Sequence, residues 1–149
     1  MAEEKNFENR VKRWLEGLGV YSLGTARDKM PVSPIGYYEK RWGGGLSKSG
    51  LPDLHIVVNG ISLDVELKSS VGRPTELQKH NIRQINGAGS IAMVLYPRGF
   101  EQFKGIVKGV IQCNLAIPAL NALKAVPSNI GCDILTDGEQ SHQMTRQTP

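Results

Sequence analysis

The sequence predicts an α/β fold: a mixed sheet with a central β-hairpin, flanked by helices, in the element order αβββαβ. Three observations support this prediction. An amphipathic helical stripe opens the chain, two β-rich runs meet at an Asn-Gly pair within residues 53–68, and a capped helical segment precedes a nearly unbroken apolar run at 90–96. With 149 residues, of which 40% are hydrophobic, the chain is long enough to bury the core of one ordinary domain.

The first helix is predicted over residues 3–18, because large apolar side chains recur there at helical spacing. They are Phe7, Val11, Trp14, Leu15 and Leu18. Gly17 and Gly19 supply the stop. Gly19 is the better candidate for the left-handed residue that closes a helix.

The region between this helix and the hairpin is less regular. Val20–Leu23 and Tyr37–Trp42 could each form a strand, and Pro31 and Pro34 break any regular element between them. Residues 43–45 are three consecutive glycines, which predict a flexible loop ahead of the hairpin.

The hairpin is the clearest local structure in the sequence. Its two runs, DLHIVV and ISLDVELK, are joined by Asn59-Gly60, a pair that suits a type I′ turn because both central residues take a positive φ. A two-residue turn fixes the register, so that His55 lies opposite Asp64 and Asp53 lies opposite Glu66. One face is then wholly apolar, with Leu54, Ile56, Val58, Ile61, Leu63, Val65 and Leu67. The other face carries Asp53, His55, Asp64, Glu66 and Lys68.

A second helix is predicted to begin near Arg73-Pro74-Thr75 and to run to about Asn86. Proline suits a first helical turn, and Thr75 with Gln78 has the spacing of a capping box. The apolar run at 90–96 is predicted to be a buried strand. We expect the first and second helices to cover the apolar face of the hairpin.

The last third of the chain is predicted to be partly helical, with a helix at about 100–113 and a shorter one over 118–125. The apolar stripe of the longer helix is Phe100, Phe103, Val107, Val110 and Ile111. Residues 127–149 are polar and turn-rich, and we expect them to be loosely ordered. This divides the chain into a core at 1–98, a helical extension at 99–126 that is available as a dimer contact, and a flexible tail at 127–149.

Composition and charge exclude several classes of protein. Eighteen Lys and Arg against 14 Asp and Glu give a net charge of +4, and residues 1–50, with nine basic and six acidic residues, hold +3 of it. Such a surface favours a polyanionic partner. No run approaches the ~20 apolar residues of a membrane span, and the polar start lacks a signal-peptide core. Cys113 and Cys132 lack metal-ligand spacing, so we expect free thiols and a cytoplasmic location.

The polar face of the hairpin predicts a metal site. Directly opposed residues place their Cβ atoms roughly 4.5–5.5 Å apart, and the carboxylates of Asp53 and Glu66 repel each other at that separation. A divalent cation between them would remove the repulsion, since hard cations prefer oxygen ligands. Lys68, two residues beyond Glu66 on the same face, can reach the same place. Any one of these residues by itself is explained as an ordinary solvated side chain on an exposed face. Their combination favours a metal site.

These residues resemble the motif of the PD-(D/E)xK nuclease superfamily, in which a Pro-Asp pair is followed by Glu-x-Lys; here twelve residues lie between the two parts. The segment SGLPDLHIVVNGISLDVELKSSVGRPTELQ is similar to the VRR-NUC (virus-type replication-repair nuclease) domain of that superfamily, over about residues 49–96. The matching residues are Gly50, Pro52-Asp53, Glu66-Leu67-Lys68, Gly72, Gln78, Gly89 and Ile91–Tyr96.

The resemblance implies a restriction-endonuclease-like αβββαβ core and hydrolysis of phosphodiester bonds in DNA with Mg²⁺ or Mn²⁺. Asp53, Glu66 and the backbone carbonyl of Leu67 would hold the metal. Archaeal-type Holliday junction resolvases carry a further metal-site Glu on the first helix. Glu8 occupies the similar place here, with Glu4, one turn earlier, as its rival.

The same resemblance implies roles for two polar side chains. Lys68 would orient the attacking water or stabilise the pentacovalent state, and its neighbouring carboxylates favour the electrostatic role. Gln78 would bond the water or the scissile phosphate, although the capping box would use the same side chain. We expect His55 and Asp64 to form a supporting cross-strand hydrogen bond, with direct ligation by His55 as the minor alternative.

Nucleic-acid contacts are predicted where basic and aromatic residues interleave beside the glycine loop. These candidates are Tyr37, Tyr38, Lys40, Arg41, Trp42 and Lys48, and the second helix adds Arg73, Lys79 and Arg83. An edge strand with amphipathic side chains is the alternative interpretation of the first group.

The leading hypothesis is a structure-specific endonuclease acting on branched DNA, such as a Holliday junction, in replication or repair. The alternatives are a less selective nuclease acting on single strands or ends, and a non-catalytic DNA-binding module that keeps the fold. Stand-alone domains of this family are typical of phages, which would place the protein in the host cytoplasm. Symmetric resolution of a junction needs two nicks, so we expect a homodimer. The stripe of the helix at about 100–113 is then buried either on the partner or on its own core.

Overall fold

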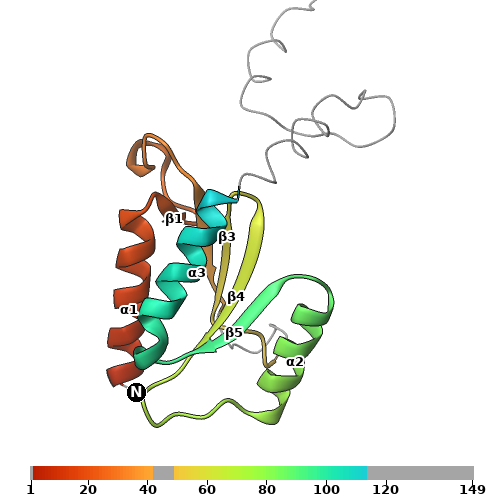
Figure 1. Cartoon of the computed structure of the whole chain (residues 1–149). Helices are drawn as coiled ribbons and strands as arrows, with labels where there is room; N and C mark the ends of the chain where they lie inside the picture. The colour runs from red at the N-terminus through yellow and green to blue at the C-terminus, as the bar shows by residue number, and fades with distance from the viewer. Residues whose placement is uncertain (1, 42–48, 114–149) are drawn as a thin grey trace, which may run out of the picture. The chain divides into compact units, whose positions relative to one another are not determined.

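The computed structural model describes residues 2–41 and 49–113 of the 149-residue chain (Figure 1). The elements in order are α1 (Ala2–Gly17), β1 (Val20–Ser22), the 3₁₀ turn η1 (Arg27–Lys29), β2 (Gly36–Lys40), β3 (Leu54–Val58), β4 (Ile61–Leu67), α2 (Glu76–Gly87), β5 (Ile91–Leu95), the 3₁₀ turn η2 (Pro97–Gly99) and α3 (Phe100–Gln112). The helix expected over 118–125 and the tail expected at 127–149 lie outside the described residues. In the described ranges no helix has the length and apolarity needed to cross a membrane.

The five strands form one mixed sheet in the order β1-β2-β3-β4-β5. Strands β2, β3 and β4 pair antiparallel, whereas β1 pairs parallel with β2 and β5 pairs parallel with β4. The β3–β4 hairpin is therefore the centre of the sheet. This confirms the predicted α/β class, with a mixed sheet around a central hairpin and helices beside it.

The hairpin register is confirmed by the turn and by the strand pairs. Asn59 and Gly60 both have positive φ, 48° and 76°, as a type I′ turn requires. The pairs run from Val58 opposite Ile61 to Leu54 opposite Val65. The turn is also tied to the last helix, because the Asn59 side chain donates a hydrogen bond of 2.7 Å to the carbonyl oxygen of Ile111.

The hydrophobic core lies between the apolar face of the hairpin and the helices α1 and α3, which lie side by side (Figure 1). Its most deeply buried members include Val11, Leu15, Leu54, Ile56, Val58, Leu63, Val65, Leu67, Phe103 and Val107. Aromatic rings join the two helices edge to face: the Phe7 and Phe100 centroids are 5.7 Å apart, and Trp14 lies 5.9 Å from both Phe100 and Phe103.

The prediction that the second helix covers the apolar face is wrong, since no residue of α2 belongs to the core cluster. The buried residue of α2 is Asn81, and its side chain bonds the backbone rather than the core. Helix α3 takes the place instead, because its stripe of phenylalanines and valines offers more apolar surface than the scattered Leu77, Ile82 and Ile85 of α2. The stripe of α3 is thus buried within its own chain and carries no argument for a dimer.

Candidate functional site

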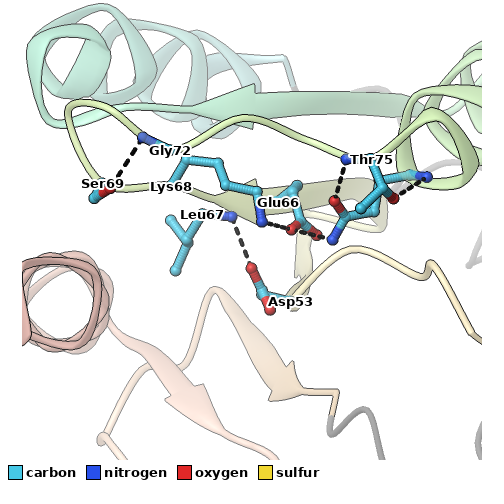
Figure 2. A network of polar contacts seen from close by, with 8 residues as sticks. Asp53, Glu66, Leu67, Lys68, Ser69, Gly72 and Thr75 are labelled. Carbon is cyan, nitrogen blue, oxygen red and sulfur yellow. Dashed lines mark hydrogen bonds and ion pairs between the residues drawn. The ribbon is translucent and has the colours of Figure 1, made fainter. Parts of the chain in front are cut away.

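The two acidic residues of the motif lie at the same end of the hairpin. Glu66 is the second-to-last residue of β4. It is 1% exposed, and its side chain lies on the face of the sheet that points away from the core. Asp53 directly precedes β3, and its Oδ2 accepts a hydrogen bond of 2.8 Å from the Leu67 amide (Figure 2). That bond holds the segment entering β3 against the end of β4, where Lys68 follows.

The Glu66 carboxylate has one satisfied and one unsatisfied oxygen. Its Oε1 accepts hydrogen bonds of 2.5 Å from Lys68 Nζ and from Gln78 Nε2. Its Oε2 is buried and has no hydrogen-bond partner among the described residues. Most buried polar atoms in folded proteins are paired, and an unpaired carboxylate oxygen is costly. The geometry therefore leaves a position for one further positive charge or donor.

Burial disfavours the charged form of both carboxylates. Burial raises the pKa of the Asp53 carboxyl, and the Leu67 amide with the charges of Lys40 and Lys68 offsets only part of this. Burial likewise raises the pKa of the Glu66 carboxyl; the charge of Asp53 adds to the effect, and Lys68 opposes it. Asp53 and Glu66 therefore repel each other, as the sequence predicts for this pair.

The Lys68 ammonium is held in its protonated form. Burial lowers its pKa, but the hydrogen bond and charge of Glu66, with the charges of Glu4 and Asp53, outweigh burial and raise the pKa above its ordinary value. A lysine that keeps its proton is a poor base. Lys68 is therefore suited to attract or stabilise negative charge.

Glu8, the glutamate of the first helix that the sequence singles out, is engaged with two lysines. Glu8 forms ion pairs with Lys12 and Lys40. Burial raises the Glu8 pKa, but the two lysines outweigh burial and lower it. The charge that reaches Asp53, Glu66 and Lys68 belongs to Glu4. Glu4 and Glu8 both stay predictions for the further metal-site residue.

Gln78 forms the predicted capping box and also bonds Glu66, whereas its contact with the attacking water or the scissile phosphate stays a prediction. The capping box at the start of α2 is confirmed, since the Thr75 side chain accepts from the Gln78 amide and Gln78 Oε1 accepts from the Thr75 amide at 2.8 Å. The other end of the same side chain donates to Glu66. The first turn of α2 is in this way attached to the carboxylate.

Asn81 is a supporting residue that sequence reasoning missed. One turn beyond Gln78, its side chain donates to the carbonyl oxygens of Ser49 at 3.3 Å and Gly50 at 2.8 Å. Gly50 has a φ of +77°, and a Cβ there would lie 2.6 Å from Leu77 Cγ. Helix α2 therefore fixes both the Gly50 turn, which leads to Asp53, and the Glu66 side chain. The signal was present: a polar residue three positions from Gln78 on the same helical face.

The expected cross-strand pair of His55 and Asp64 is confirmed, with His55 Nδ1 3.0 Å from Asp64 Oδ1. Arg41 Nη1 donates to the same oxygen at 2.7 Å. Asp64 is buried, and its Oδ1 is bonded by Arg41 and by the ring nitrogen of His55. The cluster lies on the polar face of the hairpin and supports the sheet beside Glu66.

The predicted nucleic-acid contacts divide into four groups. Tyr38 is wrong as a surface contact, because it is 4% exposed in the core and its hydroxyl donates to Glu16 at 2.6 Å. Its position opposite Ile56 turns it toward the apolar face. Lys40 and Arg41 are engaged with Glu8 and Asp64. Arg73 and Arg83 are exposed, and Tyr37 and Lys79 are partly buried. Trp42 and Lys48 lie outside the described residues.

The donor set suits a hard divalent cation. Asp53 and Glu66 supply carboxylate oxygens beside the Leu67 backbone, and the unpaired Glu66 Oε2 needs a positive partner. Within the described ranges no three His, Cys, Asp or Glu side chains are grouped closely enough to hold a metal by themselves. A cation here would therefore use two carboxylates and backbone or solvent oxygens, as Mg²⁺ commonly does.

Comparisons with known proteins found no protein similar to this chain. No protein-family model, curated protein or solved structure matches the chain.

Proposed function

We propose that the protein is a metal-dependent nuclease that hydrolyses phosphodiester bonds in DNA. The observation that carries this proposal is the buried, unpaired Oε2 of Glu66, placed beside a second, partly buried carboxylate and a protonated lysine. Such an arrangement is costly in an apo protein and becomes favourable when a divalent cation and a phosphate are bound. It is the arrangement that the resemblance to VRR-NUC domains implies.

The fold supports the proposal. Elements α1, β2, β3, β4, α2 and β5 follow one another in the αβββαβ order of a restriction-endonuclease-like core, and the motif residues lie at the start of β3 and the end of β4. Strand β1 and helix α3 are additions to that order.

In the proposed mechanism, Asp53, Glu66 and the Leu67 carbonyl would hold Mg²⁺ or Mn²⁺. When bound, such a cation would lower the pKa of a water molecule bound to it and would compensate negative charge that develops on the phosphate. Lys68 keeps its proton and stabilises the negative charge of the transition state. Gln78 positions the Glu66 carboxylate by bonding one of its oxygens, which keeps the other directed to the site.

The substrate class follows from the resemblance to junction-resolving enzymes: branched DNA, cut according to its shape. The test is cleavage of a labelled four-way junction, a flap, a duplex and a single strand, each with Mg²⁺, Mn²⁺ or EDTA. Cleavage of the junction or flap in preference to the other substrates is expected. Equal cleavage of single strands and ends would favour the less selective nuclease. Binding without cleavage of any substrate would favour the non-catalytic module.

Variants of the motif separate catalysis from binding. Asp53→Ala, Glu66→Ala and Lys68→Ala are each expected to abolish cleavage while DNA binding persists. Asp53→Asn should also bind DNA more tightly in metal-free buffer, since it removes a charge that repels phosphate. Asp28→Asn, the same change at an exposed position in η1, is the matched control. Cleavage by Asp53→Ala at the rate of the unmodified protein would refute the assignment.

A homodimer remains part of the proposal, because two nicks related by a two-fold axis need two sites. Light scattering at micromolar concentration, with and without junction DNA, tests it. A monomer mass in both conditions would contradict the dimer and weaken the case for a resolvase.

A further inference from the structure

Helix α2 is bonded to both halves of the candidate site through two side chains one turn apart. Gln78 Nε2 donates to Glu66 Oε1. Asn81, three residues later, donates to the carbonyl oxygen of Gly50 at 2.8 Å. Residues three apart lie on one face of a helix. The same helix face is therefore bonded to the Glu66 carboxylate and to the turn that leads into Asp53.

The contact between Asn81 and the Gly50 turn is buried and tightly fitted. Asn81 is 7% exposed, although its side chain is polar. Gly50 has a positive φ, and a Cβ there would lie 2.6 Å from Leu77 Cγ and 2.9 Å from Asn81 Nδ2. Real Cβ atoms do not come so close to their neighbours, so a larger residue at Gly50 must move the turn away from α2.

The connection from this turn to Asp53 is short and stiff. Two residues separate Gly50 from Asp53, and one of them is the buried Pro52, whose ring fixes its φ. The sheet holds Asp53 from the other side. Its carbonyl oxygen accepts a hydrogen bond of 2.8 Å from the Arg41 amide, and its carboxylate accepts one from the Leu67 amide. The position of Asp53 therefore depends on α2 as well as on the sheet.

We propose that Asn81 is a positioning residue that sets the separation of the Asp53 and Glu66 carboxylates and so makes the site selective for Mg²⁺ over the larger Ca²⁺. This inference rests on the proposed function and deepens it by naming what determines the choice of cation. Asn81 acts through the Gly50 turn and needs no contact with the cation. Mg²⁺ demands near-ideal octahedral geometry, whereas Ca²⁺ tolerates a range of ligand numbers and positions. A fixed separation of the carboxylates therefore favours Mg²⁺, and a relaxed one favours Ca²⁺.

The test compares the dissociation constants of Mg²⁺ and Ca²⁺ for the unmodified protein and for Asn81→Leu in the absence of DNA. Each constant is obtained from the rise of Tm with cation concentration, relative to the metal-free form of the same variant. Leucine has a size similar to that of asparagine and donates no hydrogen bond. Asn81→Leu should bind Mg²⁺ about tenfold more weakly, as is typical when a residue that orients a metal ligand is replaced. Its affinity for Ca²⁺ should change far less, so the ratio of the Ca²⁺ to the Mg²⁺ constant should fall.

Asn86→Leu is the matched control on the same helix. The Asn86 side chain also bonds the backbone, since it accepts from the Ala92 amide at 2.7 Å and donates to the Ala92 carbonyl oxygen at 3.0 Å. Its replacement therefore removes two backbone hydrogen bonds from α2, as Asn81→Leu does, but at β5 rather than at the Gly50 turn. Asn86→Leu should keep both constants of the unmodified protein. Equal changes in the two variants would show a structural role alone and would overturn the proposal.

Gly50→Ala tests the same contact by added bulk and leaves the Asn81 side chain in place. It should lower the ratio of the two constants in the same direction, because the added Cβ forces the turn away from α2. Circular dichroism establishes that each variant is folded. Where Asn81→Leu does not fold, the constants of Gly50→Ala decide the question.

The failures of the two proposals are distinguishable. Unchanged constants in Asn81→Leu and Gly50→Ala, or equal losses for Mg²⁺ and Ca²⁺, would overturn this inference even when the unmodified protein cleaves DNA. Absence of cleavage by the unmodified protein would overturn the nuclease, whereas a preference for Mg²⁺ that depends on Asn81 would still support the positioning role. An unmodified protein that binds neither cation would refute both proposals.

Discussion

Replacing Gln78 by Glu separates the two roles of that side chain. Glutamate at this position still completes a capping box with Thr75. It cannot donate to Glu66 Oε1, and it places a second carboxyl at a position where the amide now bonds a buried carboxylate. Gln78→Glu should therefore destabilise the metal-free protein although the helix cap remains.

The magnitude follows from the bonds that are lost. A hydrogen bond to a charged group contributes about 1.5–3 kcal/mol, and two like charges about 4 Å apart repel by about 4 kcal/mol at an effective dielectric constant of 20. Protonation of one carboxyl limits the second contribution, so a loss of at least ~2 kcal/mol is expected at pH 7. Gln78→Ala, which loses the bonds to Glu66 and to the Thr75 amide without added repulsion, should lose about 2–4 kcal/mol.

The pH dependence has a definite sign. The pKa of Glu66 is already raised by burial, and an adjacent carboxyl raises it further. A group whose pKa is raised on folding contributes stability that is present below the ordinary glutamate value of 4.5 and is lost as the pH rises through the raised value. The difference between Gln78→Glu and the unmodified protein should thus be small at pH 4 and large at pH 7.

Urea unfolding in EDTA at both pH values, followed by circular dichroism, measures the difference. Gln84→Glu, an exposed position on the same helix, makes the same charge change away from Glu66 and is the control. If Gln78→Glu stays within about 0.5 kcal/mol of Gln84→Glu at pH 7, the amide does not support the carboxylate and the reasoning fails.

Three further predictions follow. Mg²⁺ at 100 times its Kd should stabilise the protein by about 2.7 kcal/mol in thermal unfolding; Glu66→Gln should remove this gain, and an unchanged Tm on adding metal would count against the site. Tyr38→Phe should cost about 0.5–1.5 kcal/mol through its lost bond to Glu16, with DNA affinity unchanged in a gel-shift titration; a weakened affinity would restore Tyr38 to the binding surface. Gly50→Ala should cost about 1–3 kcal/mol in urea unfolding, because of its positive φ and the contact with Leu77, and an unaffected protein would show that the turn relaxes freely.

Local structure could be predicted where a short sequence determines the backbone. The Asn59-Gly60 turn determined the register of the five residue pairs between β3 and β4, and the Thr75–Gln78 spacing located the start of α2. Both signals depend on residues within a few positions of one another. The pairing of His55 with Asp64 followed from that register alone.

Arrangement in three dimensions was harder to predict, because it depends on competition between distant segments. The apolar stripe of α3 covers the apolar face of the hairpin in place of α2. No local pattern in α2 alone could indicate this outcome. The ion pairs of Glu8 with Lys12 and Lys40 could not be predicted from the first helix alone, because Lys40 comes from a different element. Tyr38 was placed in the core by its position opposite Ile56 in a neighbouring strand.

The position of α3 has a consequence for the order in which the protein can fold. Phe103 and Val107 complete the cover of the hairpin, and Ile111 receives a bond from Asn59, 52 residues earlier in the chain. During synthesis the last strand, which ends at Leu95, is therefore complete before the covering helix Phe100–Gln112. Until then, the apolar face formed by residues such as Ile56 and Leu63 stays partly open to water. The nascent chain thus passes through an aggregation-prone interval that ends only when residues 100–112 become available.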